Sequence, residues 1–164
     1  MKHFLSEFIY GGMDGIITTI AVIAGTIGAN ISSKYALILG LANIISDGFS
    51  MGVSRYNSLI DINQSTNSIT AKNNPLMSAI FTFIFFIVMG CIPLLPFLFI
   101  DYNDETLIKK MLFIFGVISF LIIGIIKGLH TKKLFKSIFE ILIIGSISAY
   151  ISFNVAFHVN KIML

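Results

Sequence analysis

The chain has 164 residues, of which 56% are hydrophobic and 12% are charged, and its mean hydropathy is +0.93. A soluble domain carries about 25% charged residues, so this composition excludes an ordinary soluble domain. Several apolar runs reach the roughly 20 residues that a helix needs to cross about 30 Å of hydrocarbon. We therefore expect an all-α polytopic membrane protein, with residues 1–164 forming a single transmembrane domain.

Five membrane-spanning helices are expected, at about residues 8–29, 35–57, 75–100, 107–126 and 138–158. Residues 28–33, Gly-Ala-Asn-Ile-Ser-Ser, predict a tight turn between the first two spans. Pro75 suits the first turn of the third helix, where its missing N–H would be unpaired anyway. Residues 58–74 form the longest polar link, which is too short for a separate domain.

The distribution of basic residues predicts the orientation in the bilayer. With five spans, the side of the N-terminus would hold Lys2, Arg55, Lys72, Lys127, Lys132, Lys133 and Lys136, and the other side Lys34, Lys109, Lys110 and Lys161. Seven basic residues against four predict a cytoplasmic N-terminus. The net charge of +3 is explained by orientation and by lipid headgroups, so no nucleic-acid partner is expected.

Two aspartates, Asp14 and Asp47, lie inside stretches that otherwise resemble lipid-spanning helices. An ionised carboxylate at the centre of a bilayer costs about 2.5–3.5 kcal/mol, so each must face protein, water or a cation. The simpler alternative is that each is a buried carboxylate that accepts hydrogen bonds from nearby Ser or Thr hydroxyls. We favour a functional role for both.

Polar residues form a stripe on each of the first two predicted helices. Asn43, Asp47 and Met51 follow one another at four-residue spacing and therefore share one helix face. Glu7 lies two turns before Asp14 on the first helix. Carboxylate and amide oxygens bind divalent cations, and a thioether favours softer transition metals over Mg²⁺ or Ca²⁺. If the two stripes face each other, they form a polar cleft suited to such an ion.

Cys91 is the only cysteine, which excludes an intramolecular disulfide and a Cys-x-x-Cys site. Because it lies in an apolar span, we expect it to pack as a small hydrophobic residue. Nothing in the sequence predicts catalytic residues or a resident cofactor.

Three segments resemble the vacuolar iron transporter family. Residues 7–19, Glu-Phe-Ile-Tyr-Gly-Gly-Met-Asp-Gly-Ile-Ile-Thr-Thr, resemble its opening helix. Residues 40–52, Gly-Leu-Ala-Asn-Ile-Ile-Ser-Asp-Gly-Phe-Ser-Met-Gly, and residues 90–97, Gly-Cys-Ile-Pro-Leu-Leu-Pro-Phe, resemble its second and third helices. The similarity covers nearly the whole chain and is weakest in the last two spans.

The resemblance implies a five-helix protomer and a homodimer, with a cation path at the dimer interface lined by the first two helices. It also implies export of Fe²⁺, often with Mn²⁺, from the cytosol in exchange for protons. Glu7, Asp14 and Met51 match the family pattern. The expected metal-binding residues are Asp14, Asp47, Met51, Asn43 and Glu7.

Three departures from the family pattern stand out. Asn43 occupies a position where some members carry Glu, and Asp47, one turn on, would replace that charge. Arg55 stands where many members have Glu, which weakens the expectation of metal capture at the cytoplasmic mouth. Residues 58–74 replace the acidic metal-binding domain of some members, so the chain resembles a minimal form.

The predicted function is therefore transport of a divalent transition metal, Fe²⁺ and also Mn²⁺, out of the cytosol by exchange with protons. The membrane would be that of a vacuole-like compartment or the plasma membrane. A channel, a non-transporting scaffold and a degenerate family member remain alternatives. A membrane enzyme is disfavoured: Asp14-Gly15 is similar to the start of the CDP-alcohol phosphotransferase motif, but no Arg precedes Arg55.

Overall fold

A computed structural model describes residues 2–65, 74–100 and 104–163, and these residues are almost entirely helical. The elements in chain order are α1 (Lys2–Gly28), α2 (Ser33–Ser65), α3 (Pro75–Cys91), the 3₁₀ helix η1 (Ile92–Leu98), α4 (Glu105–Thr131) and α5 (Leu134–Met163). Five helical segments, with α3 and η1 counted together, are long and apolar enough to cross a membrane. The predicted all-α fold with five spans is therefore confirmed, whereas the cytoplasmic location of the N-terminus stays a prediction.

Local sequence explains where the helices begin and end. After α1, Asn30 takes a left-handed conformation with φ of 53°, and the N–H of Ile31 donates to the Thr26 carbonyl, which closes the predicted turn. Asn tolerates this conformation better than most residues do. Asn74 caps α3 by accepting hydrogen bonds from the backbone of Leu76 and Met77, and Pro75 occupies the first turn as predicted.

The structure corrects the predicted link at residues 58–74. α2 continues to Ser65, so residues 58–65 are helical, and residues 66–73 lie outside the described residues. Leu59 is only 3% exposed, which shows that this extension of α2 still packs on the protein. The fourth and fifth helices are also longer than predicted. Helical hydrogen bonding continues past the point where the apolar run ends, because it needs no apolar side chains.

The third span changes its helical type near its end. Pro93 and Pro96 have no N–H to donate to the preceding turn, and the chain passes from α-helix to 3₁₀ helix at Ile92. Both prolines are buried, so the tighter segment is packed inside the bundle.

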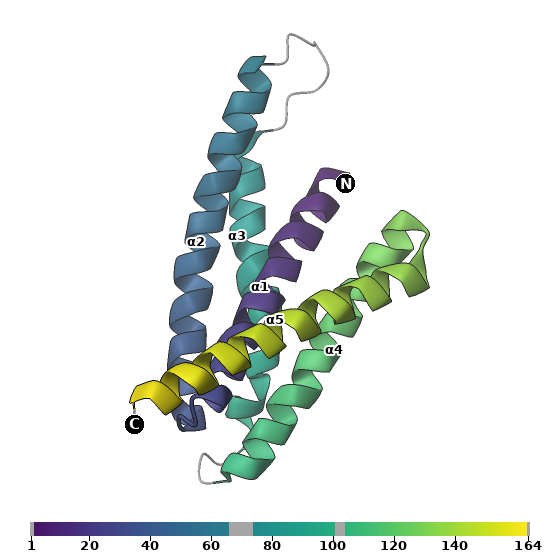
Figure 1. Cartoon of the computed structure of the whole chain (residues 1–164). Helices are drawn as coiled ribbons and strands as arrows, with labels where there is room; N and C mark the ends of the chain where they lie inside the picture. Colours follow the sequence, from purple (N-terminus) through teal and green to yellow (C-terminus); the bar gives the residue numbers. More distant parts are fainter. Residues whose placement is uncertain (1, 66–73, 101–103, 164) are drawn as a thin grey trace.

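α1 lies at the centre of the bundle, between α2, α3 and α5, and α5 runs obliquely across it (Figure 1). Two apolar clusters hold the helices together. One contains Ile23, Ile44, Phe86, Leu94 and Ile108, and the other contains Ile16, Met89, Phe120, Ile123 and Ile141. In lipid, such clusters stabilise the fold through close packing more than through the hydrophobic effect. One long face of α2 remains exposed in the single chain.

Candidate functional site

Asp14 of α1 and Asp47 of α2 lie close enough for the charge of Asp47 to act on Asp14. Asp14 is half-buried, whereas Asp47 is exposed on the surface of the single chain. The Thr18 hydroxyl donates to the backbone oxygen of Asp14 at 2.8 Å and not to its carboxylate. Among the described residues, no hydrogen bond to the Asp14 carboxylate is found. This aspartate is therefore not a carboxylate satisfied by neighbouring hydroxyls.

Asn43 and Met51 lie one turn on either side of Asp47. The Asn43 amide donates to Asp47 Oδ2 over a long distance of 3.4 Å. Met51 is half-buried and packs against the cluster that contains Phe86. The two residues thus place an amide and a thioether on the helix that carries Asp47.

Glu7 has a different environment, since its side chain is only 1% exposed and forms an ion pair with Arg55. Arg55 Nη2 lies 2.7 Å from Glu7 Oε1, and Arg55 Nε donates to Glu7 Oε2 at 2.9 Å. The Thr82 hydroxyl of α3 also donates to Glu7 Oε2, at 3.0 Å. The carboxylate that was expected to attract cations is therefore held by three donors of the protein itself.

Sequence reasoning treated Arg55 as a departure from a family pattern and missed its pairing with Glu7. A signal existed, because Arg55 lies four residues after Met51 and continues the same stripe on α2. Thr82 had no such signal, since only the packing of α1 on α3 brings it to Glu7. We call the set Glu7, Asp14, Asn43, Asp47, Met51 and Arg55 the α1–α2 seam.

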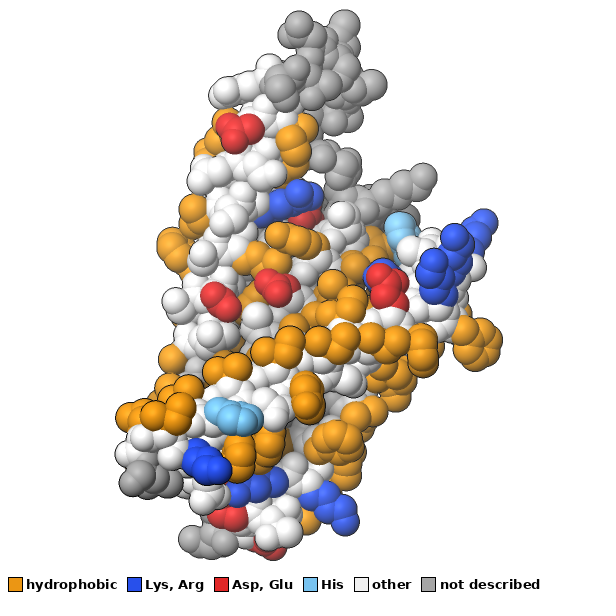
Figure 2. All heavy atoms as spheres, viewed as in Figure 1, with side chains coloured by type: hydrophobic (Ala, Val, Ile, Leu, Met, Phe, Trp, Pro, Cys, Tyr) orange, Lys and Arg blue, Asp and Glu red, His pale blue; other side chains and the backbone are white. Residues whose placement is uncertain are grey.

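The surface over α1 and α2 carries acidic side chains amid apolar and neutral ones (Figure 2). An open cavity of about 670 Å³ lies beside Asn43, between α1, α2 and α5. Its walls are made largely of small and hydroxyl-bearing residues, among them Gly25, Thr26, Ser46 and Ser152. The seam thus borders an open space whose walls are mainly small and apolar and carry a few hydroxyl and amide groups.

Within the described part of the chain, no group of three or more His, Cys, Asp or Glu residues is placed to hold a metal ion. In one copy of the seam, the two carboxylates without a basic partner are those of Asp14 and Asp47, and Asn43 adds an amide.

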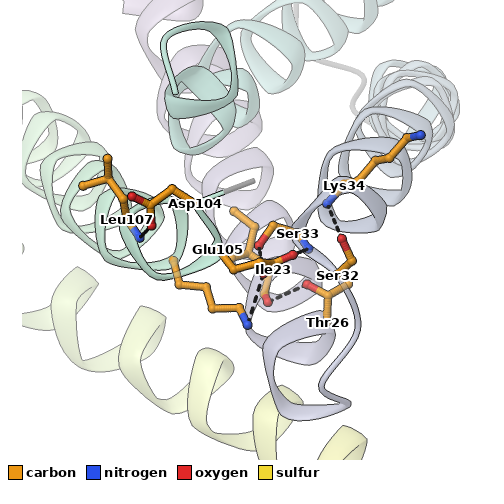
Figure 3. A network of polar contacts seen from close by, with 9 residues as sticks. Ile23, Thr26, Ser32, Ser33, Lys34, Asp104, Glu105 and Leu107 are labelled. Carbon is orange, nitrogen blue, oxygen red and sulfur yellow. Dashed lines mark hydrogen bonds and ion pairs between the residues drawn. The ribbon is translucent and has the colours of Figure 1, made fainter. Parts of the chain in front are cut away.

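A second polar cluster lies at the other end of the bundle, where α2 and α4 begin (Figure 3). Glu105 accepts hydrogen bonds from the Ser33 backbone at 2.9 Å and from the Ser33 hydroxyl at 2.7 Å. Lys109 Nζ lies 3.2 Å from the same carboxylate. Glu105 therefore caps the start of α2 from another helix, which is a structural role.

These features define an integral membrane protein with an acidic seam between two of its spanning helices. The VIT family model matches residues 5–73 and 60–156, which together cover most of the chain. The chain belongs to this family.

Curated relatives agree with this assignment. The chain is 40% identical over 55 residues to a vacuolar iron transporter of Toxoplasma gondii, covering 34% of this chain and 18% of the relative. It is 42% identical over 57 residues to one of Plasmodium berghei, covering 35% of this chain and 21% of the relative. Both alignments thus cover about a fifth of the relatives' length.

A third relative, the vacuolar iron transporter of Centaurea cyanus, is 25% identical over 211 aligned positions, covering 92% of this chain and 85% of the relative. That alignment is longer than the 164 residues of this chain, so the relative contains residues that this chain lacks. Only residues 66–74 separate α2 from α3, which is too short for the cytoplasmic domain of some members. The chain is a minimal form of the family.

Proposed function

We propose that this protein transports divalent transition-metal ions across a membrane. The observation that carries the proposal is the placement of Asp14 and Asp47 on neighbouring spanning helices, close enough to interact. Two carboxylates without a fixed cation between them attract a divalent ion, and intramembrane carboxylates commonly mark ion pathways. The names of the relatives, vacuolar iron transporters, point to the same cargo class.

Fe²⁺ is the proposed main cargo, with Mn²⁺ as a second. The Asp14 and Asp47 carboxylates would bind the ion, and the Asn43 amide would add an oxygen ligand. Met51, one turn from Asp47, would favour a softer transition metal over Mg²⁺ or Ca²⁺. All four residues belong to the α1–α2 seam, and Asn43 and Asp47 are already within 3.4 Å of each other.

Exchange with protons follows from the ligand chemistry. A carboxylate must be deprotonated to bind metal, so protons arriving from the acidic side compete for Asp14 and Asp47 and release the ion. Movement out of the cytosol depends on the orientation predicted from the Lys and Arg distribution.

The exposed polar face of α2 supports a homodimer. Ser46, Asp47 and Ser50 are all exposed in the single chain, within a helix that spans the membrane. Contact of an aspartate with lipid would cost about 2.5–3.5 kcal/mol, so this face needs a protein or water cover. A second copy supplies that cover and brings a second pair of carboxylates to the same place.

A non-transporting scaffold is the second candidate, and the Glu7–Arg55 pair favours it. The Glu7–Arg55 ion pair has no net charge and occupies one end of the seam, as expected for a family member that no longer binds metal.

Metal flux into proteoliposomes tests the proposal. With an acidic interior, we expect Fe²⁺ uptake that collapses with the pH gradient and is lost in Asp14→Asn. Glu140→Gln is the matched control and should retain uptake. Glu140 is a carboxylate of α5 that lies outside the seam and forms an ion pair with Lys127 at 3.2 Å. Wild-type flux in Asp14→Asn would contradict the proposed ion path. No uptake and no calorimetric metal binding by the wild type would identify a scaffold.

A further inference from the structure

The Glu7–Arg55 ion pair places a cation of the protein itself on a carboxylate of the α1–α2 seam. We propose that Arg55 is an internal plug, whose guanidinium occupies a latent divalent-cation site at Glu7 and closes this end of the seam. The inference rests on the proposed function, since it concerns how Arg55 controls the access of a cation to Glu7, a carboxylate of the same seam. It concerns a residue at which this chain departs from the family pattern.

The geometry shows how completely Arg55 occupies the carboxylate. Both Glu7 oxygens are engaged, at 2.7 and 2.9 Å, in a bidentate contact of the kind that arginine forms with carboxylates. With Glu7 only 1% exposed, an ion from solvent has no access to these oxygens while the guanidinium is in place. The positive charge of Arg55 also repels a second cation from the same end.

The Arg55 side chain can move from Glu7 into solvent, because it is 24% exposed, whereas the Glu7 side chain is buried. Arginine is long and flexible, and its guanidinium is less strongly hydrated than an ammonium group. Departure would leave an ionised carboxylate buried without a counter-ion, a state that the protein strongly disfavours. A divalent cation that enters as Arg55 leaves removes this cost, so the two cations compete for one carboxylate.

The carboxylate would remain in position without Arg55. The Thr82 hydroxyl donates to Glu7 Oε2 at 3.0 Å, and Thr82 belongs to α3, whereas Arg55 belongs to α2. Gly11, one turn after Glu7, lies directly against the Thr82 backbone, since a Cβ atom at position 11 would be 2.5 Å from the Thr82 carbonyl oxygen. The α1–α3 contact therefore holds Glu7 and Thr82 together, which preorganises a cation site that Arg55 blocks.

Mn²⁺ binding to the purified full-length protein tests the plug. The measurement uses the double variant Asp14→Asn/Asp47→Asn, which lacks the two carboxylates proposed to bind the transported ion. The result at Glu7 therefore does not depend on whether Asp14 and Asp47 bind metal, and so not on whether the proposed function is correct. In this background Arg55→Gln should add one bound Mn²⁺ per chain, with an affinity at least tenfold above that of the parent. The gain should vanish when Glu7→Gln is added. No gain in Arg55→Gln, or a gain that survives Glu7→Gln, overturns the proposal.

A second measurement covers the case in which Arg55→Gln does not fold. A hydrophobic carbodiimide modifies protonated carboxyl groups in membrane segments, and peptide mass spectrometry locates the adduct. We expect Glu7 to be unmodified in the wild type and modified at least fivefold more in Arg55→Met, which keeps an unbranched side chain but removes the charge and the bidentate contact. Added Mn²⁺ should then protect Glu7 in Arg55→Met. Rapid modification of Glu7 in the wild type, or no protection by Mn²⁺ in Arg55→Met, would show that Arg55 does not plug a cation site.

Discussion

The backbone of Gly11 lies against that of Thr82 so closely that a Cβ atom at position 11 would be 2.5 Å from the Thr82 carbonyl oxygen. Gly15, one turn on, meets the backbone of Phe86 in the same way. The atoms in the way belong to the backbone of α3, which cannot rotate aside as a side chain can. These two glycines therefore set the distance between α1, which carries Glu7 and Asp14, and the helix behind it.

Gly11→Ala should push α1 away from α3 and destabilise the protein by about 1–3 kcal/mol, the usual cost of overpacking. Thermal unfolding in detergent, followed by loss of the monodisperse peak in size-exclusion chromatography, measures this. Gly116→Ala is the matched control, because its new methyl group would meet only the Ile20 side chain, at 3.3 Å. Equal melting temperatures for the two variants would contradict a special role for the α1–α3 contact.

Met51→Leu tests the proposed preference for transition metals. Leucine preserves the volume and packing of methionine but removes the sulfur ligand. We expect the selectivity for Fe²⁺ over Mg²⁺ to fall roughly tenfold, the effect of a ligand contact worth about 1.4 kcal/mol. Competition of Mg²⁺ with Fe²⁺ uptake in proteoliposomes gives the ratio. Met89→Leu, a buried methionine of α3 outside the seam, should leave it unchanged.

Cross-linking tests the proposed homodimer. In a Cys91→Ala background, Ser46→Cys on the exposed polar face of α2 should form a disulfide between copies under mild oxidation. Phe113→Cys on α4 is the control, because it is 74% exposed but lies on an apolar, lipid-facing surface. A dimer band of equal strength from both variants would indicate random collisions in the bilayer.

Glu105 provides a test at the other end of the bundle. Its carboxylate accepts both Ser33 hydrogen bonds, so Glu105→Ala should destabilise the protein by about 1 kcal/mol. Lys109→Ala removes only an exposed i,i+4 ion pair with Glu105, which contributes about 0.3–0.5 kcal/mol. The difference in melting temperature between these two variants checks the assignment. A larger loss from Lys109→Ala would show that the ion pair, and not the cap of α2, is the stabilising contact.

Much of the fold was predictable from local rules. Apolar runs of spanning length gave the five helices, Pro75 marked the start of α3, and residues 28–33 marked the first turn. The continuation of α2 through residues 58–65 was not predictable from hydropathy, because most of that segment's residues are polar. Within it, Leu59 is buried.

The sequence by itself determined that two acids share a face of the first helix and that an acid, an amide and a thioether share a face of the second, because helical periodicity depends only on residue spacing. It also placed these groups within apolar spans, since hydropathy and length are properties of the chain alone. Only the tertiary structure decided their partners. Asp14 lies within range of the charge of Asp47. Glu7 forms an ion pair with Arg55 and accepts a hydrogen bond from Thr82, residues 48 and 75 positions away along the chain. Helix packing brings such distant residues together, and it depends on close backbone contacts such as that of Gly11 with Thr82, which no local pattern specifies.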